Sequence, residues 1–355
     1  MKKKVVHFYT DPTSTGGPNT YINTINGSGY LREKYDFSCV YQYKRLNKLT
    51  PKDIKRIVGE LKEVAPDIIH IHGLQGEGMV GLFCAKLYGK AKTLLTVHGM
   101  QHDSYNTSRA KSFVYKNLIE KWTLRHADGV FCVCEAAEKS DYISRNAKNL
   151  LPHLHNCVAS MPEYSKETER AALGFGADDT VIISVGRITV GKGAAVLTEI
   201  IEKDPDPHHK YLILGDGGYL KTMRERLAEQ ISQGRVITTG AVSDVGRYLA
   251  ASDLYVSTSY KENLSISILE AGYYGLPSIV TPVGGNGEII SSGYNGEFFA
   301  VEDADGFFSA MDKILKTGID AYRKNAKERI TNHFSLAQFE RGLGDIYDKV
   351  LRSDR

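Results

Sequence analysis

The sequence lacks the features that mark several special classes of protein. No apolar run approaches the roughly 18 residues that a membrane-spanning helix requires. Five cysteines are too few and too irregularly spaced to indicate a disulfide framework or a zinc site. No repeat of about 20–50 residues, no low-complexity tract and no recognised nucleic-acid-binding module is visible. We therefore expect a globular protein of the reducing cytoplasm that does not bind nucleic acid.

The start of the chain also lacks the apolar stretch of a secretory signal peptide. Three lysines lead into a short apolar run at 5–9, and Asp11 and Pro12 follow it. This run is too short for the hydrophobic region of a signal sequence, whereas it has the length of a β-strand. We therefore interpret 5–9 as the first strand of a sheet.

The net charge of +3 conceals an uneven distribution of charge. Residues 1–165 contain about 23 lysines and arginines against 15 aspartates and glutamates, whereas the rest of the chain contains about 22 against 27. A basic first half indicates contact with an anionic surface or an anionic acceptor. Scattered, solvated lysines are the simpler alternative.

Apolar runs of strand-like composition alternate with helical patterns along the whole chain. Such alternation predicts an α/β protein whose parallel sheets are built from βαβ units. Between 150 and 164 the chain has two prolines and no clear period, which places a domain boundary near 155–170. The expected strands are 5–9, 37–41, 68–71, 93–97 and 129–133 in the first half and 181–185, 211–214, 236–239, 254–258 and 278–281 in the second.

The segment 259–277 carries the most functional information. Glu262 lies in a polar loop behind the expected strand 254–258, and Glu270 lies eight residues later in a stretch with helical apolar spacing. A loop that leads into a helix offers free N–H groups and the positive end of the helix dipole to a phosphate. Two carboxylates beside such a phosphate can hold hydroxyl groups of a sugar and of a ribose. A pair of glutamates alone is more often solvated, so the surrounding sequence decides.

That surrounding sequence resembles the retaining glycosyltransferases of family 4, which have two Rossmann-like domains. The signature of this family is similar to Glu262, Glu270 and the following Gly275-Leu-Pro. The resemblance extends over roughly residues 5–335. Further similar pieces follow one another in the expected order: Gly16-Gly17, Thr96-Val-His98-Gly, Val185-Gly186-Arg187, Gly191-Lys192-Gly193, Leu214-Gly-Asp-Gly, Ala251-Ser-Asp253, Gly284-Gly285 and Gly293-Tyr-Asn-Gly.

The resemblance implies the GT-B type of fold, in which two Rossmann-like domains face a cleft that holds the ligands. Residues 1–160 would form the acceptor-side domain and residues 161–335 the domain that binds the nucleotide sugar. The last segment, 336–355, would be a helix that packs back on the first domain. Its apolar stripe also fits an ordinary helix docked on the second domain.

The resemblance also implies the reaction. The protein would transfer a sugar, with retention, from a nucleotide-sugar donor to a saccharide or lipid-linked acceptor of a cell-surface glycan such as a capsule or O-antigen. A UDP-sugar is favoured over a GDP-sugar as the donor. Asn263-Leu264 and Gly272-Tyr273-Tyr274 depart from the usual pattern beside the expected sugar pocket, so the transferred sugar stays unassigned.

Several residues can be given expected roles. Arg187 and Lys192, at the start of a helix near Gly193, would neutralise the leaving diphosphate without a metal; a basic turn on a solvated loop is the alternative. The resemblance places Glu262 on the hydroxyls of the sugar and Glu270 on those of the ribose. The residues expected to act in catalysis are Glu262, His98, Arg187 and Lys192. The residues expected to bind the donor are Gly16, Gly17, Gly186, Arg187, Lys192, Val242, Glu262, Asn263, Leu264, Ser265 and Glu270.

No metal or other cofactor is expected. The histidines His70, His72, His98 and His102 have suitable side chains, but their spacing forms no recognised ligand set. Two other functions remain open: a nucleotide-sugar epimerase or hydrolase of the same architecture, and a non-catalytic, two-lobed ligand-binding protein.

A basic and aromatic stretch at 109–125 indicates where the protein works. Its phenylalanine, tyrosine, leucine and tryptophan side chains alternate with lysines and arginines, a combination that suits the headgroup region of an anionic bilayer. We expect peripheral contact with the inner face of the membrane. The alternative is that these helices simply pack their apolar faces on the sheet.

Overall fold

The computed structural model describes residues 2–10, 17–100, 102, 105 and 107–353. The chain divides into two compact units, one of which combines Met1–Asn156 with Leu336–Arg355, while the other is Cys157–Ser335. The two units therefore meet in the sequence at Asn156 and Cys157, near the predicted limit at residue 160. Within the described residues, no helix combines the length and the apolar character needed to cross a bilayer.

The first unit contains a five-stranded parallel sheet. Its strands follow the order β2-β1-β3-β4-β5. Consecutive buried residues such as Ile68 and Ile69 face opposite sides of this sheet, as expected for a parallel sheet covered on both faces. All five predicted strands of the first half are confirmed. They are β1 (Lys3–Tyr9), β2 (Tyr35–Tyr41), β3 (Ile68–His72), β4 (Lys92–Val97) and β5 (Gly129–Cys132).

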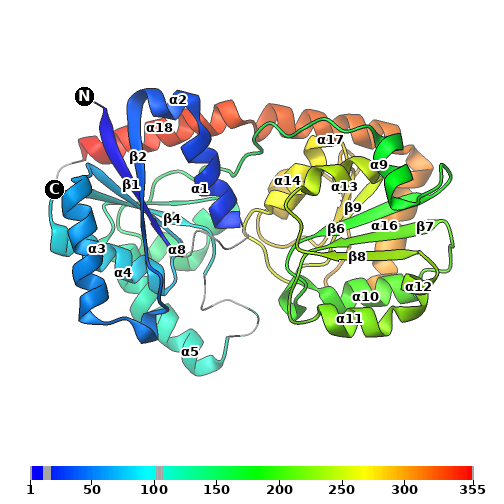
Figure 1. Ribbon diagram of the computed structural model, residues 1–355, viewed down its shortest axis with the longest axis horizontal. Coiled ribbons are helices and arrows are strands. Elements are labelled where there is room, and N and C mark those ends of the chain that lie inside the picture. The colour runs from blue at the N-terminus through cyan, green and yellow to red at the C-terminus, as the bar shows by residue number, and fades with distance from the viewer. Residues whose placement is uncertain (1, 11–16, 101, 103–104, 106, 354–355) are drawn as a thin grey trace. The chain divides into compact units, whose positions relative to one another are not determined.

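Helices cover both faces of this sheet (Figure 1). The local sequence explains how the helix at 51–64 begins: Thr50 caps it, Pro51 is its first residue, and the Asp53 carboxylate accepts a hydrogen bond from the Thr50 backbone N–H. The helices of this unit are α1 (Gly17–Gly27), α2 (Gly29–Lys34), α3 (Pro51–Val64), α4 (Gly76–Tyr88), α5 (Arg109–Val114), α6 (Glu120–His126), α7 (Glu135–Glu138), α8 (Asp141–Asn146) and α18 (Leu336–Arg352), with short turns η1 (Leu46–Lys48) and η2 (Tyr115–Ile119).

The C-terminal helix α18 belongs to the first unit, although the whole second unit precedes it in the sequence. The Tyr347 hydroxyl lies 2.8 Å from Nδ1 of the buried His70 on β3. The Tyr35 hydroxyl donates to the Asp348 carboxylate at 2.8 Å. The buried side of α18 also includes Phe339 and Leu343. The predicted packing of this helix on the first domain is therefore confirmed, and the alternative of docking on the second domain is wrong.

The second unit contains a six-stranded parallel sheet in the order β11-β10-β9-β6-β7-β8. The sequence predicts five of these strands correctly and misses β11, which has only three residues. The strands are β6 (Thr180–Val185), β7 (His209–Leu214), β8 (Val236–Gly240), β9 (Leu254–Ser257), β10 (Ser278–Val280) and β11 (Gly296–Phe298).

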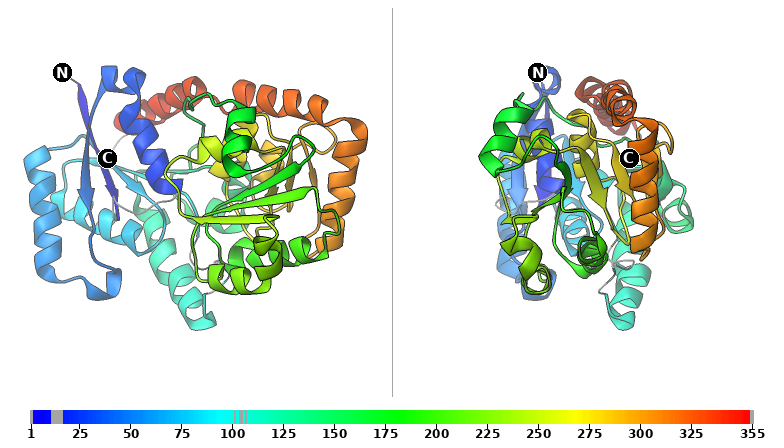
Figure 2. Two further views of the ribbon diagram at one scale, coloured as in Figure 1. Left: turned by 45° about the vertical axis from the view of Figure 1, so that its right-hand side comes forward. Right: turned by 90° about the vertical axis from the view of Figure 1, so that its right-hand side faces the viewer.

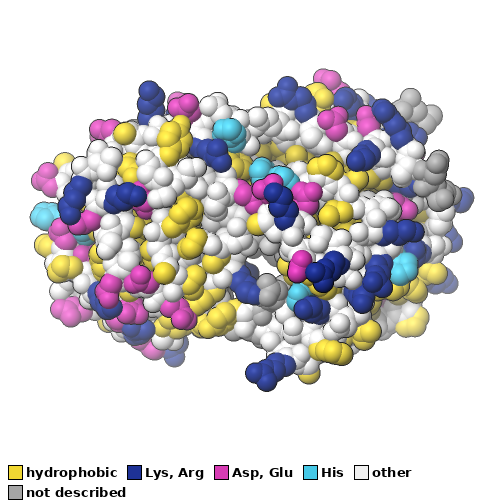
Figure 3. All heavy atoms as spheres, turned by 180° about the vertical axis from the view of Figure 1, so that it is seen from behind, with side chains coloured by type: hydrophobic (Ala, Val, Ile, Leu, Met, Phe, Trp, Pro, Cys, Tyr) yellow, Lys and Arg dark blue, Asp and Glu magenta, His cyan; other side chains and the backbone are white. Residues whose placement is uncertain are grey.

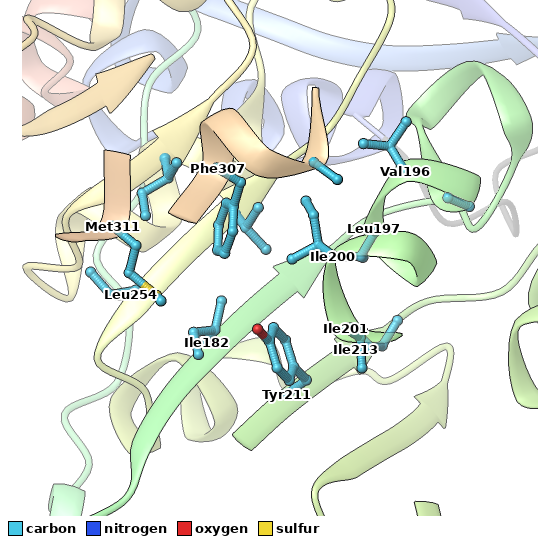
Figure 4. Packing of buried hydrophobic residues seen from close by; sticks show 14 of the residues in the cluster. Ile182, Val196, Leu197, Ile200, Ile201, Tyr211, Ile213, Leu254, Phe307 and Met311 are labelled. Carbon is cyan, nitrogen blue, oxygen red and sulfur yellow. The ribbon is translucent and has the colours of Figure 1, made fainter. Parts of the chain in front are cut away.

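This second sheet also lies between two layers of helices (Figures 1 and 2). Helices α10 and α16 pack on one face, where Ile182, Ile200, Phe307 and Met311 converge in the hydrophobic core (Figure 4). The other face carries α13, α14 and α17. The helices are α9 (Lys166–Leu173), α10 (Ala194–Lys203), α11 (Leu220–Arg226), α12 (Ala228–Ser232), α13 (Val245–Ala251), α14 (Ile266–Tyr273), α15 (Asn286–Ile289), α16 (Ala304–Thr317) and α17 (Ile319–His333), with the turn η3 (Val190–Lys192).

Candidate active site

Most of the predicted donor-binding residues lie in loops that leave the carboxyl ends of strands in the second unit. Gly186 and Arg187 follow β6, Val242 follows β8, and Glu262 follows β9. The carboxyl ends of parallel strands meet at one edge of a sheet, where α/β proteins usually bind their ligands. The β9 and β10 loops also touch directly, because the Gly285 N–H donates to the Asn263 carbonyl at 2.6 Å.

The loop between β6 and α10 carries two of the predicted cations. Arg187 is exposed, and its guanidinium has no hydrogen-bond or ion-pair partner in the part of the chain that the structure describes. Lys192 ends the turn η3, and Gly193 follows it with a φ of 71°. A Cβ atom at Gly193 would lie 1.8 Å from the Thr258 carbonyl oxygen. Gly193 is therefore needed for the close approach of these two loops.

Lys192 and Glu262 form an ion pair across these two loops. The Lys192 Nζ donates to Glu262 Oε1 at 2.5 Å, and the Ser259 hydroxyl donates to the same oxygen at 2.9 Å. The Glu262 side chain keeps only 12% of its exposure and the Lys192 side chain keeps 30%. The sequence gives these two residues separate tasks, whereas the structure brings their charges into contact. Ser259 was missed, since no spacing marks a loop serine three residues before a glutamate as its partner.

The loop at 283–286 supports the backbone beside Glu262. Gly284 has a φ of 54°, and a Cβ atom there would lie 1.8 Å from the Glu262 carbonyl oxygen. Asn263 follows, and its side-chain Nδ2 is buried without a hydrogen-bond partner within the described residues. A buried donor that lacks a partner costs free energy, so this amide is a candidate contact for a ligand.

Glu270 lies in the middle of α14 and is partly buried. Among the described residues its carboxylate has no hydrogen-bond or ion-pair partner. Burial raises its pKa from 4.5 to about 7, because the charged form loses hydration without gaining a compensating contact. A carboxylate in this state is available to accept two hydroxyl groups, as expected for a ribose.

The remaining predicted residues of the second unit differ in exposure. Val242 is partly buried, while Leu264 and Ser265 are buried at the start of α14. The hydroxyls of Tyr273 and Tyr274 donate to the backbone carbonyls of Met161 and Pro162. The effect of this departure from the family pattern on the sugar pocket stays a prediction.

In the first unit, His98 follows β4 at the carboxyl edge of that sheet and is partly buried. Its ring packs edge-on against Tyr21, with 4.8 Å between the ring centroids. Gly17 is the exposed first residue of α1. The predicted residue Gly16 lies outside the described residues.

Three histidines of the first unit form a buried cluster that the sequence only partly indicates. Ring nitrogens of His7, His70 and His72 all lie within 4.8 Å of one another. Both ring nitrogens of His70 are occupied, by the Tyr347 and Thr96 hydroxyls at 2.8 and 2.6 Å. His70 therefore has no lone pair to offer a metal ion. The sequence misses His7, which joins the cluster through the pairing of β1 with β3.

The basic and aromatic stretch divides into a buried part and an exposed part. Leu124 and Ile119 face the interior, so part of this stretch does pack in the way that the simpler alternative predicts. Phe113 and Leu118, in contrast, are 66% and 62% exposed. Figure 3 shows basic and hydrophobic side chains next to each other over this end of the first unit. We call the exposed Arg109, Lys111, Phe113, Val114, Lys116 and Leu118 the α5 surface.

The sequence matches two family descriptions, one for each unit. "Glycosyltransferase Family 4" matches residues 20–140, and "Glycosyl transferases group 1" matches residues 165–333. The chain belongs to glycosyltransferase family 4. It is therefore a retaining glycosyltransferase, as the resemblance implies.

Relatives of this glycosyltransferase include two bacterial enzymes. UDP-Gal:alpha-D-GlcNAc-diphosphoundecaprenol alpha-1,3-galactosyltransferase of Escherichia coli is 26% identical over 310 residues, which cover 83% of this chain and 79% of that protein. N-acetyl-alpha-D-glucosaminyl L-malate synthase of Bacillus anthracis is 23% identical over 349 residues, which cover 95% of this chain and 86% of that protein.

Solved structures of the same architecture confirm the predicted fold class. Sucrose-phosphate synthase from Thermosynechococcus elongatus aligns with a TM-score of 0.84 at 19% identity, covering 99% of this chain and 100% of that chain. HepE from Anabaena in complex with UDP-glucose aligns with a TM-score of 0.77 at 18% identity, covering 98% and 99%. At these identities the likeness establishes the GT-B fold alone.

The raised pKa of Glu270 makes a prediction about stability. Between about pH 4.5 and 7 the folded protein holds a proton that the unfolded chain has released, so this residue lowers stability progressively as the pH rises through that range. Glu270→Gln removes this penalty. We expect the variant to gain more in urea denaturation midpoint, relative to the wild type, at about pH 8 than at about pH 5.

Glu297→Gln is the matched control. Burial alone would raise the pKa of Glu297, but hydrogen bonds from Lys313 and Ser292 lower it overall, so Glu297 stays ionised at both pH values. The effect of Glu297→Gln on the midpoint should therefore be similar at both. An effect of Glu270→Gln that is equal at the two pH values would contradict the raised pKa of Glu270.

Proposed function

We propose that this glycosyltransferase moves a sugar from a UDP-sugar to a lipid-linked saccharide during the synthesis of a cell-surface glycan. The observation that carries the proposal is the group of poorly satisfied polar side chains at the carboxyl edge of the second sheet. Arg187 and Glu270 have no partner within the described residues, and neither has the buried Nδ2 of Asn263. A nucleotide sugar supplies an anionic diphosphate and several hydroxyl groups, which complement these side chains.

Each side chain receives a role in the transfer. Arg187 and Lys192 stabilise the diphosphate, whose negative charge grows as its bond to the sugar breaks. Glu262, held beside Lys192 by their ion pair, accepts hydroxyls of the sugar, and Glu270 accepts those of the ribose. The N–H groups of Asn263, Leu264 and Ser265 lead into α14 and face the phosphates. These cations make a divalent metal unnecessary.

The donor, the acceptor and the remaining residues are assigned from the relatives of this chain. Family resemblance places His98 beside the donor sugar and Gly17 beside the donor phosphates, and Gly186 and Val242 remain assigned to donor binding. The name of the Escherichia coli relative specifies UDP-Gal as its donor and a diphosphoundecaprenol-linked sugar as its acceptor. These names support a UDP-sugar and a lipid-linked acceptor here.

The α5 surface gives the proposed acceptor a point of entry. Lysines and arginines there attract anionic headgroups, while Phe113 and Leu118 can enter the boundary between headgroups and acyl chains. The turn η2 is a π-helix, whose extra residue per turn shifts the helix face between α5 and α6. We propose that this surface binds the anionic inner leaflet, so that the protein works on the cytoplasmic side.

A donor panel tests the proposed function directly. We expect transfer from a labelled UDP-sugar, and not from GDP-sugars, to an undecaprenyl-diphosphate-linked sugar, with activity that survives EDTA. Epimerisation or hydrolysis without an acceptor would favour the second enzymatic function. Binding without turnover would favour a ligand-binding protein. Loss of activity in EDTA that Mg²⁺ or Mn²⁺ restores would overturn the assignment of Arg187 and Lys192 in place of a metal.

Substitution of the cations should affect turnover more than binding. We expect Arg187→Ala and Lys192→Ala each to lower kcat about 10²–10³-fold with a smaller change in KM, because the charge that they stabilise develops in the transition state. Lys221→Ala, at an exposed lysine of α11, is the control and should keep wild-type kinetics. Equal losses in kcat and in affinity for UDP would mean that these cations also stabilise the bound ground state, and not the transition state alone.

Substitution of the α5 surface should release the protein from anionic vesicles. We expect Phe113→Ser/Leu118→Ser to weaken co-sedimentation with vesicles that contain phosphatidylglycerol, and high salt to weaken it for the wild type. Phe83→Ser/Leu87→Ser removes a second exposed apolar pair, on α4, and is the matched control. If both pairs weaken binding equally, or if neither does, the α5 surface is not the membrane contact.

A further inference from the structure

A chain of three histidines connects the interior of the first unit with His98. Nδ1 of His7 lies 2.9 Å from Nε2 of His72, and Nδ1 of His72 lies 3.4 Å from Nε2 of His98. His7 is completely buried and His72 is 5% exposed, whereas His98 reaches the carboxyl edge of the sheet. The chain therefore begins inside the fold and ends where family resemblance expects the donor sugar.

All three imidazoles are neutral near pH 7. Burial lowers the pKa of His7 to about 3 and that of His98 to about 4. The pKa of His72 is also lowered, first by burial and then by its neighbours His70, His7 and His98. Each ring then carries one proton, and one nitrogen donates while the other accepts.

His7, at the inner end of the row of histidines, determines which ring nitrogen carries the proton. Nε2 of His7 is buried and has no hydrogen-bond partner within the described residues. A buried N–H group without a partner is rarer in folded proteins than an acceptor without one. The proton of His7 therefore belongs on Nδ1, which donates to Nε2 of His72.

The tautomers of His72 and His98 follow from that of His7. Because Nε2 of His72 accepts, the proton of His72 lies on Nδ1 and points to Nε2 of His98. Nε2 of His98 then accepts in its turn, although at 3.4 Å this last hydrogen bond is long. The proton of His98 is left on Nδ1, which has no partner in the described part of the chain.

We propose that His7 and His72 are positioning residues that hold His98 in the Nδ1–H tautomer, so that His98 presents a hydrogen-bond donor to the sugar. Free neutral histidine favours the other tautomer, with its proton on Nε2. An N–H donor suits a hydroxyl or ring oxygen of a bound sugar, whereas a bare nitrogen lone pair would act as a base. The role in transfer rests on the proposed function, but the tautomer itself does not.

Nitrogen NMR of the whole protein tests the tautomer. In protein labelled with ¹⁵N-histidine near pH 7, we expect Nδ1 of His98 to resonate as a protonated, pyrrole-type nitrogen and Nε2 as an unprotonated, pyridine-type nitrogen. His98→Gln, which removes these two signals, gives their assignment. A protonated Nε2 in His98, or a charged imidazole, would overturn the proposal.

Two substitutions of His72 separate positioning from a purely structural role. Asparagine can place an N–H donor where Nδ1 of His72 lies, whereas leucine cannot. We expect His72→Asn to keep the Nδ1–H signature of His98 and most of the activity. His72→Leu should lose that signature and lower kcat about tenfold or more.

The outcomes remain distinguishable from those of the donor panel. An unchanged His98 tautomer in His72→Leu would refute the positioning role, even if the panel finds a glycosyltransferase reaction. A correct tautomer in a protein that transfers no sugar would refute the proposed function and leave the assignment of the protons intact. Circular dichroism of both variants shows whether they are folded.

Discussion

The parallel pairing of every strand is the constraint on which the rest of the structure depends. Because the strands of each sheet point the same way, each chain segment that leaves a carboxyl end emerges at the same edge. Arg187, Glu262 and Gly284 are far apart in the sequence and are collected at one edge only by this rule. His98 reaches the corresponding edge of the first sheet. Parallel sheets need helices on both faces, which explains why central strands such as β3 are buried along their whole length.

Features encoded by neighbouring residues could be predicted from the sequence. The cap of α3 needs only Thr50, Pro51 and Asp53, and the core strands need only runs of apolar residues. The Rossmann-like halves and the location of Glu262 and Glu270 also follow from local patterns. The strand β11 was missed because its three residues include a glycine and a glutamate, whereas the equally short β10 has two adjacent β-branched apolar residues.

Contacts between distant residues could not be predicted in this way. The ion pair of Lys192 with Glu262 joins positions 70 residues apart, and only the crossing of two loops reveals it. The sequence identifies Asp253 as part of a family motif but does not show its structural role. Its buried carboxylate accepts a hydrogen bond from the Val181 N–H and forms ion pairs with Lys166, Arg170 and Arg323. The order of the histidine chain likewise depends on the pairing of β3 with β1 on one side and with β4 on the other.

The position of α18 in the sequence has a consequence for the synthesis of the protein. The first unit is interrupted, because its last helix follows all of Cys157–Ser335. At the usual speed of translation, about ten seconds or more pass between the emergence of β5 and the emergence of α18. During that time Tyr35 and His70 lack their contacts with α18, while the uninterrupted second unit can complete its own fold. The nascent chain therefore finishes its first unit last and exposes that face of the sheet to chaperones and proteases until then.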